Sequence, residues 1–252
     1  MQNTLQKNIR FNNFRFIPRF EIKGNYLIKG MKMEGLKKID NIFTRIEKTL
    51  SDGADEIIID DIVASLYSRK FDIDFLKELS QFVNIPITFC GGIRNLNDID
   101  LLLKNGADKI SLNTITYYDK KFVSNAVKNY GSQCINCSIQ VKKIHDIFYC
   151  YYLSGREKSH YTIDDKIIEI NELGIGEISI FSIDFDGLEK GVDKKLIKKI
   201  NNKIDIPILY GGGITNLNDI NFLINQGWRG AIISSSYHYG NLDINDIKSS
   251  LM

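Results

Sequence analysis

The sequence has 252 residues, 43% hydrophobic and 25% charged, which is typical of an ordinary soluble globular protein and excludes a disordered chain. Its 33 basic and 31 acidic residues give a formal net charge of +2, which gives no reason to expect binding to nucleic acid or to an acidic membrane surface. No stretch approaches the roughly 18 apolar residues of a membrane-spanning helix. Residues 1–16 lack the apolar core and cleavage site of a signal peptide, so we expect a cytoplasmic protein.

Apolar, β-rich runs alternate with amphipathic segments from one end of the chain to the other. This alternation predicts a parallel sheet with helical crossovers, and eight such units in about 250 residues predict a closed (β/α)8 TIM barrel. An open doubly wound sheet is the alternative, although no GxGxxG motif follows the first strand. The expected strands cover 14–21, 56–61, 85–90, 109–113, 134–140, 177–182, 206–211 and 231–236, and the expected helices lie near 40–52, 72–83, 96–105, 119–129, 163–173, 193–202, 217–226 and 243–251.

An internal repeat strengthens the barrel interpretation. Residues 89–114 match 210–235, residues 53–63 match 174–184, and residues 84–87 match 205–208, always at an offset of 121. A constant offset over three separate blocks is hard to produce by chance. We therefore expect a single domain made of two similar half-barrels, about 14–130 and 131–252.

Each half carries a glycine turn between a strand and a helix. Such turns let the backbone approach an anion closely, and the N-terminus of the following helix adds a partial positive charge. The next strand of each half ends in a small polar pair, which a barrel brings to the same rim. A tight turn without a ligand is the alternative, but the duplication favours two phosphate sites and a ligand phosphorylated at both ends. The candidate residues are Gly91, Gly92, Asn113 and Thr114 in the first half, and Gly211, Gly212, Ser234 and Ser235 in the second.

Acid–base candidates lie at strand ends in the same rim. Glu21 ends the first strand and can titrate, whereas Gln140 ends the fifth strand and can only orient a ligand through hydrogen bonds. The alternative for Glu21 is a rim carboxylate paired with Lys23 or Lys29. Asp186 and Gly187 follow the sixth strand, and together with Lys29 they complete the predicted ligand-binding set.

A second charged set lies near strand starts, which gather at the opposite end of a barrel. Two basic and two acidic side chains there predict a closed ring of salt bridges, because buried charges are costly unless they are paired. The position alone favours a stabilising plug over a gate. The set comprises Arg15, Glu56, Lys109 and Glu177.

Metal and redox sites are disfavoured. Cys134 and Cys137 form a CxxC pair, but no second pair exists and the three histidines are dispersed. We expect buried or half-buried thiols, with no metal and no nucleotide cofactor.

Several of these segments together resemble one family, the cyclase (synthase) subunit of imidazole glycerol phosphate synthase. The resemblance covers nearly the whole chain from Arg15 and rests on residues 60–65, 91–114, 131–133, 176–187, 210–214 and 234–239. It implies a cytoplasmic lyase of histidine biosynthesis and a glutaminase partner whose ammonia enters the bottom of the barrel. At the top, that ammonia reacts with a bisphosphorylated ribulosyl intermediate.

The resemblance also implies roles for individual residues. It makes the ring of four charges an ammonia gate, which reverses the structural preference stated above. It places Asp108 and Gln133 at the partner interface and in communication with the site.

The chain departs from the family at the chemistry. The resemblance places aspartates at the ends of strands one and five, where this chain has Glu21 and Gln140. About 1 Å of misplacement can cost about 100-fold in rate, and glutamine cannot titrate at all. Phe181 and Tyr210 replace small hydroxyl residues, so we expect the second phosphate pocket to be narrowed.

Residues 21–36 and 61–69 also look like paralogues associated with surface-glycan biosynthesis. That resemblance implies a barrel that delivers ammonia to a separate sugar amidotransferase. The alternatives are a working cyclase that relies on Glu21, and a regulatory barrel that only activates a glutaminase.

Overall fold

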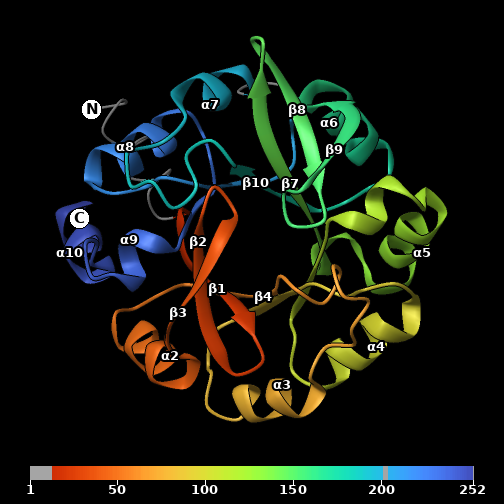
Figure 1. The fold of residues 1–252 in the computed structure, drawn as a ribbon, viewed down its shortest axis with the longest axis horizontal. Helices are drawn as coiled ribbons and strands as arrows, with labels where there is room; N and C mark the ends of the chain where they lie inside the picture. The colour runs from red at the N-terminus through yellow and green to blue at the C-terminus, as the bar shows by residue number, and fades with distance from the viewer. Residues whose placement is uncertain (1–12, 201–203, 252) are drawn as a thin grey trace.

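The computed structural model describes residues 13–200 and 204–251, and its centre is a closed barrel of eight parallel strands (Figure 1). Each strand pairs with the next, the last pairs with the first, and β7 pairs with β10, so the barrel is continuous. The predicted (β/α)8 fold is therefore confirmed, and the open sheet is excluded. The barrel strands are β1 (Arg15–Lys23), β4 (Ile57–Asp61), β5 (Ile87–Cys90), β6 (Lys109–Leu112), β7 (Ile135–Ile144), β10 (Glu177–Ser182), β11 (Ile208–Gly211) and β12 (Gly230–Ile233).

Helices surround the barrel in chain order, as Figure 1 shows. They are α2 (Ile42–Ser51), α3 (Ile73–Ser80), α4 (Leu96–Lys104), α5 (Lys120–Tyr130), α6 (Ile163–Glu172), α7 (Lys194–Ile200), α8 (Leu217–Asn225), α9 (Ser235–His238) and α10 (Ile244–Leu251), with short 3₁₀ turns η1 (Thr114–Tyr117) and η2 (Ser132–Cys134). Each predicted helix is present, although the one expected over 193–202 is described only to Ile200. No helix in the described part of the chain is long and apolar enough to cross a membrane.

Alternate residues of each strand pack in two different layers. Outward side chains such as Phe16, Ile57 and Ile110 join the helices in the main hydrophobic core. Inward side chains such as Ile17 and Ile58 form a smaller cluster inside the barrel. Burying an aliphatic or aromatic side chain of this size contributes about 1.5–3 kcal/mol, so the outer layer supplies most of the driving force for folding.

The repeat predicted from the sequence recurs in the backbone. The amide of Ile57 donates to Pro86 O and that of Ile178 to Pro207 O, each at 3.0 Å and 121 residues apart. Helices α4 and α8 begin in the same way, because the Asn95 and Asn216 side chains both accept from a backbone N–H three residues ahead. Equivalent turns are thus placed on opposite sides of the barrel.

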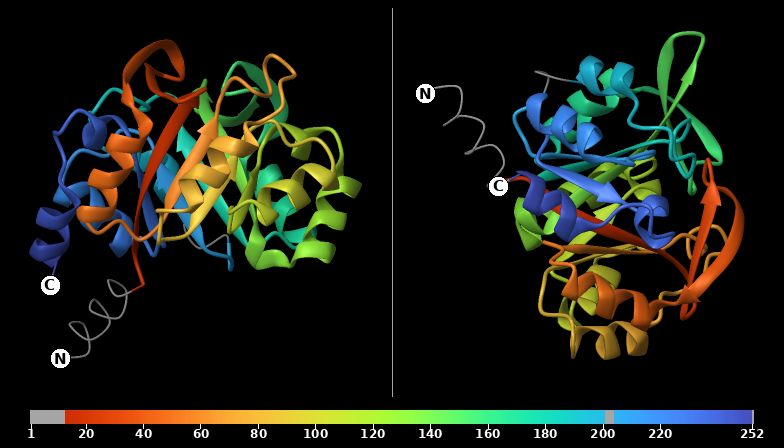
Figure 2. Two further views of the ribbon diagram at one scale, coloured as in Figure 1. Left: turned by 90° about the horizontal axis from the view of Figure 1, so that it is seen from below. Right: turned by 90° about the vertical axis from the view of Figure 1, so that its left-hand side faces the viewer.

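Two antiparallel extensions rise from the C-terminal end of the barrel, and the sequence analysis missed both. β2 (Tyr26–Met31) and β3 (Glu34–Asn41) continue β1, and β8 (Ile147–Tyr152) and β9 (Glu157–Thr162) continue β7. Figure 2 shows both extensions at the same end of the molecule. They flank the C-terminal opening of the barrel, which we call the mouth, where the predicted ligand residues lie.

Several predicted strand limits were wrong by one to four residues, and two of these differences lie in functionally relevant segments. The strand expected over 231–236 ends at Ile233, because Ser234 turns the chain and Ser235 begins α9. The strand expected to start at Cys134 starts at Ile135, because Cys134 closes the 3₁₀ turn η2. The first change brings the serines of the second half to the mouth on a turn rather than on a strand.

Candidate functional site

Four charged side chains close a ring at the N-terminal end of the barrel. Arg15 Nη1 lies 2.7 Å from Glu56 Oε2, and its Nη2 pairs with Glu177. Lys109 Nζ lies 2.8 Å from Glu56 Oε2 and 3.4 Å from Glu177 Oε2. Burial opposes the charge of Arg15, but the two glutamates raise its pKa above the ordinary value. The predicted salt-bridged ring is therefore present, with each base between two acids.

A hydrogen-bonded chain leads from this ring into the barrel. Asn136 Nδ2 donates to Glu177 Oε2 at 3.3 Å and to Ser179 Oγ at 2.9 Å. Ser111 Oγ donates to Asn136 Oδ1 at 2.8 Å, and Thr88 Oγ1 donates to Glu56 Oε1 at 2.6 Å. All four of these polar side chains are buried. One side of the interior is thus polar, and the other carries the apolar side chains of the inner cluster.

Asp108 and Gln133, predicted at a partner interface, are both exposed near the strand starts. Asp108 Oδ2 accepts from the backbone N–H of Ile87 at 2.8 Å, so it also fixes the entrance to β5. Gln133 belongs to η2, just before β7. Both residues are therefore accessible at the ring end of the barrel, as a role in docking would require.

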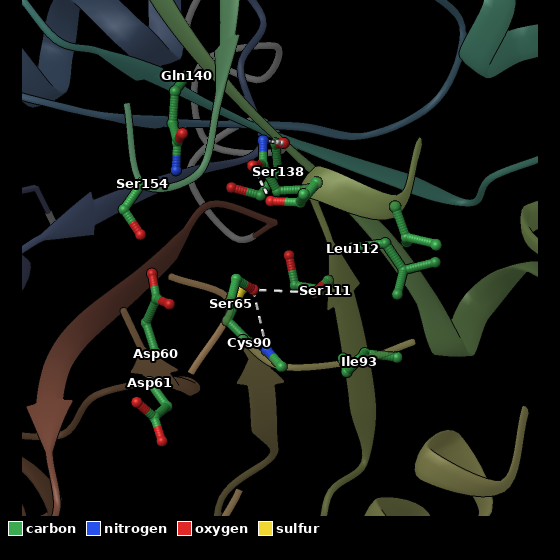
Figure 3. Close-up of a pocket in the computed structure, with 15 residues that line it drawn as sticks. Asp60, Asp61, Ser65, Cys90, Ile93, Ser111, Leu112, Ser138, Gln140 and Ser154 are labelled. Carbon is green, nitrogen blue, oxygen red and sulfur yellow. Dashed lines mark hydrogen bonds between the residues drawn. The ribbon is translucent and has the colours of Figure 1, made fainter. Parts of the chain in front are cut away.

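The first glycine turn lines a pocket at the opposite end, the first cradle. Its wall includes Gly91, Gly92, Asn113 and Thr114, as predicted, together with Gln140. Figure 3 shows Gln140, Ser154 and Asp60 pointing into one space while Asp61 points away from it. The Gln140 side chain is buried, and its Oε1 has no hydrogen-bond partner within the described chain. The first cradle therefore combines a glycine turn with an unused acceptor.

The glycines of the two turns adopt backbone conformations that other residues rarely take. Gly91 and Gly212 have φ of 103° and 114°. A side chain on Gly91 would overlap the carbonyl of Asp61, and one on Gly212 would lie 2.8 Å from the carbonyl of Ser182. Because Asp61 and Ser182 are also related by the offset of 121, the same close approach is built twice.

The second cradle is assembled from the matching elements. Its pocket includes Gly212, Ser234 and Ser235, and the buried Ser235 Oγ has no hydrogen-bond partner within the described chain. Gly211, also predicted here, lies beneath the ring of Phe181. Phe181 lines this pocket, and that it narrows the pocket stays a prediction.

The expectation for Tyr210 was wrong. Its side chain faces the helices, where it is fully buried and makes an edge contact with Trp228 at 5.5 Å. The Tyr210 hydroxyl accepts from the backbone N–H of Asp193 at 2.8 Å. Residues alternate faces along β11, so Leu209 and Gly211 point inward and Tyr210 cannot narrow the mouth.

Glu21 is enclosed by two cations. Its Oε1 lies 3.0 Å from Arg19 Nη1 and its Oε2 lies 2.7 Å from Lys29 Nζ. Lys29 also contacts Asp186 Oδ1 at 3.0 Å, and Arg19 contacts Asp60 Oδ2 at 2.6 Å. The alternative in which Glu21 pairs with Lys29 is therefore observed, and Glu21 lines neither cradle.

Burial and charge act in opposite directions on the two cations of this network. Burial would lower the pKa of Lys29, but Asp186 and Glu21 raise it above its ordinary value. Burial would likewise lower the pKa of Arg19, which Glu21, Asp60 and Asp186 raise. Lys29 and Asp186 were predicted to bind ligand. In the structure they form an ion pair with each other, and Lys29 also pairs with Glu21. Asp186 and Gly187 line the second cradle.

Sequence reasoning missed Arg19 and Asp60. Both are inward positions, because Arg19 is two residues before Glu21 on β1 and Asp60 is two residues after Ile58 on β4. The signal that could have identified them was a charged residue spaced by two from the inward-facing residues of a buried strand.

Cys90 lines the first cradle, but none of the described cysteines offers a reactive thiolate there. Cys90, Cys137 and Cys150 are buried free thiols and Cys134 is half-buried. Burial raises the pKa of Cys137 to about 11, so this thiol stays protonated at neutral pH. Among the described residues, no cluster of histidine, cysteine or acidic side chains could hold a metal ion.

His238 makes a testable contribution to stability. Its Nε2 bonds Arg19 O at 2.9 Å, and burial lowers its pKa to about 4. Between about pH 6.5 and pH 4, the imidazole of His238 therefore takes up a proton in the unfolded chain but stays neutral in the folded protein. We expect the free energy of unfolding to fall by about 3 kcal/mol across that window, and to be fully restored above it. Urea denaturation of the wild type and of His238→Gln at several pH values measures this, because the variant has no imidazole to titrate. If the free energy of unfolding changed equally with pH in both proteins, His238 would not be the group responsible.

Comparison with known proteins identifies the family. A family model described as histidine biosynthesis protein matches residues 15–243. The chain belongs to this family. The family-level resemblance drawn from the sequence is therefore confirmed, together with the barrel fold that it implied.

The family members most like this chain include subunits of one enzyme. The chain is 36% identical to the imidazole glycerol phosphate synthase subunit HisF of Legionella pneumophila, over 83% of this chain and all of the relative. It is 34% identical to the HisF subunit of Helicobacter hepaticus over 94% of each chain. The HisF subunit of Flavobacterium psychrophilum is 32% identical over 94% of this chain and 95% of its own. The closer likeness to surface-glycan paralogues stays a prediction.

Proposed function

We propose that this barrel receives ammonia from a glutaminase docked at the end of the barrel that bears Arg15, Glu56, Lys109 and Glu177. The ammonia passes through the interior to the C-terminal mouth, where a separate acceptor uses it. Membership of a family whose relatives are synthase subunits supports a partner. The exposed Asp108 and Gln133 are the residues we assign to that docking surface.

The polar interior supports the passage of ammonia. The chain from Glu177 through Asn136 reaches Ser111, and Ser111 itself lines the first cradle. Ammonia donates and accepts hydrogen bonds, so alternating hydroxyl and amide groups replace the bonds that it loses on leaving water. The opposite, apolar side of the interior does not offer this compensation.

The observation that carries the proposal is the state of Glu21 and Gln140. Both oxygens of Glu21 are held in ion pairs with Arg19 and Lys29, and Gln140 cannot exchange a proton. General acid–base catalysis needs a titrating group within hydrogen-bond reach of the reacting atoms. In this proposal the polar chain still reaches the mouth at Ser111, but positions 21 and 140 no longer supply the two titrating acids that cyclisation requires.

The acceptor in this proposal is a sugar bound by a separate amidotransferase of surface-glycan biosynthesis. The support for this step is the likeness of residues 21–36 and 61–69 to such paralogues. The second candidate function is a working cyclase of histidine biosynthesis. It is favoured by the names of the relatives and by the two glycine turns that the barrel retains.

The proposal is tested with the glutaminase subunit and the sugar amidotransferase from the same genome and glutamine labelled with ¹⁵N at the amide. We expect a stable complex with the glutaminase and ¹⁵N in the product. Lys109→Ala opens the ring, so we expect at least about fivefold less labelled product per glutamate formed, since an exposed and unpaired path leaks ammonia.

Lys121→Ala, which removes an exposed lysine of α5, is the matched control. A barrel that only activates the glutaminase would give the same ratio of product to glutamate in Lys109→Ala as in the wild type. A monomeric barrel with no affinity for the glutaminase would refute both the conduit and the activator.

A further inference from the structure

The exposed apolar side chains of the described residues gather at one end of the barrel. Nine large hydrophobic side chains are exposed, and six of them lie in segments that connect the C-terminal end of a barrel strand to an outer helix. These mouth segments are residues 23–41, 62–72, 91–95, 113–119, 142–162, 183–193, 212–216 and 234–243. The six side chains are those of Tyr26, Met31, Tyr67, Tyr118, Ile147 and Tyr239. Single exposed apolar residues are common, but six around one opening indicate a surface that another molecule covers.

The two antiparallel extensions stand on opposite sides of the mouth (Figure 1). β2 and β3 extend β1, β8 and β9 extend β7, and three barrel strands lie between β1 and β7 in either direction. Each extension carries a lysine over a tyrosine ring. Lys38 Nζ lies 3.5 Å from the centroid of the Tyr26 ring, and Lys158 Nζ lies 3.7 Å from that of Tyr149. Because these rings are held before a partner arrives, less conformational entropy is lost when one binds.

A third aromatic group lies on the rim of the first cradle. The ring of Tyr118, 64% exposed, meets Tyr152 edge-on at 5.4 Å between centroids, and Tyr152 lies 5.2 Å from Tyr117. Beneath them the fully buried Lys166 holds its Nζ 4.0 Å from the centroid of the Tyr117 ring. Tyr117 ends the turn η1, whose first residue, Thr114, lines the cradle. An aromatic group that is anchored below and open above is typical of the residues that dominate the energy of an interface.

The same face is basic. Exposed basic side chains outnumber exposed acidic ones in the mouth segments by ten to five, and by twelve to nine when half-buried side chains are counted. The whole chain carries only +2, so the basic excess is concentrated at this end. Opposite potentials favour docking and raise the rate of association, so we expect the partner to present an acidic surface.

Two other occupants fit this face less well. A second copy of the chain would set one basic mouth against another, which is repulsive. Strand addition is also opposed, because β3 carries Lys37 and Lys38 at an edge that pairs with no other described strand than β2. A lipid surface is flat, whereas the two extensions project at the mouth (Figure 2). An acidic protein surface with apolar pockets matches the charge and the shape together.

We propose that the mouth face, formed by the mouth segments, docks the enzyme that accepts the ammonia through an acidic and partly apolar surface of that enzyme. The identity of the partner rests on the proposed function, and the docking face adds where and by what chemistry the partner is recognised. Ser111, at the end of the polar chain from the ring, lines the first cradle within this face. A partner seated on the rim therefore encloses the exit, and ammonia passes to it without crossing bulk water.

Binding of the purified sugar amidotransferase to the complex of barrel and glutaminase, measured by interferometry, tests the proposal. We expect the double variant Tyr67→Ser with Tyr118→Ser to weaken that binding by at least about tenfold, because both rings lose their contacts with the partner. Raising the salt concentration from about 0.05 M to about 0.5 M should weaken the wild-type complex, since exposed charges are then screened.

The matched control is Leu101→Ser with Ile168→Ser, which removes two exposed apolar side chains from the outer helices α4 and α6. We expect this control to change the affinity by less than about twofold. Equal weakening in the control, or full binding by the tyrosine variant with folding intact by circular dichroism, would overturn the docking face. Self-association of the barrel, or sedimentation with phosphatidylglycerol vesicles, that is lost in the tyrosine variant would assign the face to a second copy or to a lipid surface instead.

Failure of the docking face and failure of the proposed function give different results. Transfer of ¹⁵N to the sugar without measurable docking, or unchanged in the tyrosine variant, would refute the docking face alone. Docking of the amidotransferase to the barrel as expected, with no glutaminase complex, would refute the ammonia path alone.

Discussion

Given excess ammonium salt at alkaline pH and the bisphosphorylated ribulosyl substrate of the family, the purified barrel is expected to form imidazole glycerol phosphate far more slowly than an ordinary enzyme. Ammonium bypasses the glutaminase, so the assay tests only the chemistry of the barrel. Positioned acid–base groups contribute about 10²–10⁴-fold in rate, and this mouth has Glu21 in two ion pairs and a glutamine at position 140. We therefore expect a rate at least about a hundredfold below an ordinary turnover of about 1 per second.

The matched variant restores the acids and removes the large side chain that lines the second cradle. Gln140→Asp returns a titrating group to β7, Glu21→Asp shortens the side chain on β1, and Phe181→Thr clears the second cradle. We expect the triple variant to gain measurable cyclisation over the wild type. Wild-type turnover near about 1 per second would instead show that Glu21 suffices and that the chain is a working cyclase.

The sequence was sufficient to predict the parts of the fold that repeat. The alternation of apolar runs with amphipathic segments, and the offset of 121 between the two halves, predicted eight strands that the structure closes into a barrel. The charge ring was predictable for the same reason. Glu56 and Glu177 are related by that offset, and strand starts gather at one end of any such barrel.

The extensions β2–β3 and β8–β9 were missed because their pattern differs from that of the buried barrel strands. β3 is exposed or half-buried along its whole length, so it lacks the continuous apolar run that marks a barrel strand. Turns with positive φ at Lys32 and Met33 join β2 to β3, and turns with positive φ at His145 and Asp146 join β7 to β8. Residues other than glycine at such positions give a weak turn signal.

Side-chain direction explains what was right and wrong in the mouth. Phe181 and Tyr210 were treated alike because both are large residues near the end of a strand. Their strands place them on opposite faces, so Phe181 meets Arg19 inside the barrel and Tyr210 packs on Trp228 outside it. The contact between Arg19 and Phe181 joins residues 162 positions apart, and no local pattern in a single sequence specifies such a pair.

The largest effect on stability is expected from Glu56→Gln. Glu56 is 2% exposed and accepts from Arg15, Lys109 and Thr88. Removing its charge leaves two cations sharing Glu177, and breaking a buried charge network of this kind costs about 3 kcal/mol. For a chain of this size that corresponds to a fall in the melting temperature of about 6–12 °C, which differential scanning calorimetry measures.

Glu177→Gln is the matched comparison, because the offset of 121 relates it to Glu56. Glu177 is more exposed, and its contact with Lys109 is longer, at 3.4 Å against 2.8 Å for Glu56. We therefore expect Glu177→Gln to cost about half as much as Glu56→Gln. Equal costs would mean that burial of Glu56 does not determine the strength of the ring.

A double-mutant cycle then separates the ring from simple loss of side-chain packing. Lys109→Met together with Glu56→Gln removes one charge of each sign, so the interior is left with one base and one acid that still pair as Arg15 and Glu177. We expect the double variant to be more stable than the sum of the single costs predicts, by about 1–2 kcal/mol. Additive costs would show that Lys109 and Glu56 act independently. The ring would then be a set of separate surface pairs, too weakly coupled to close the entrance of the barrel.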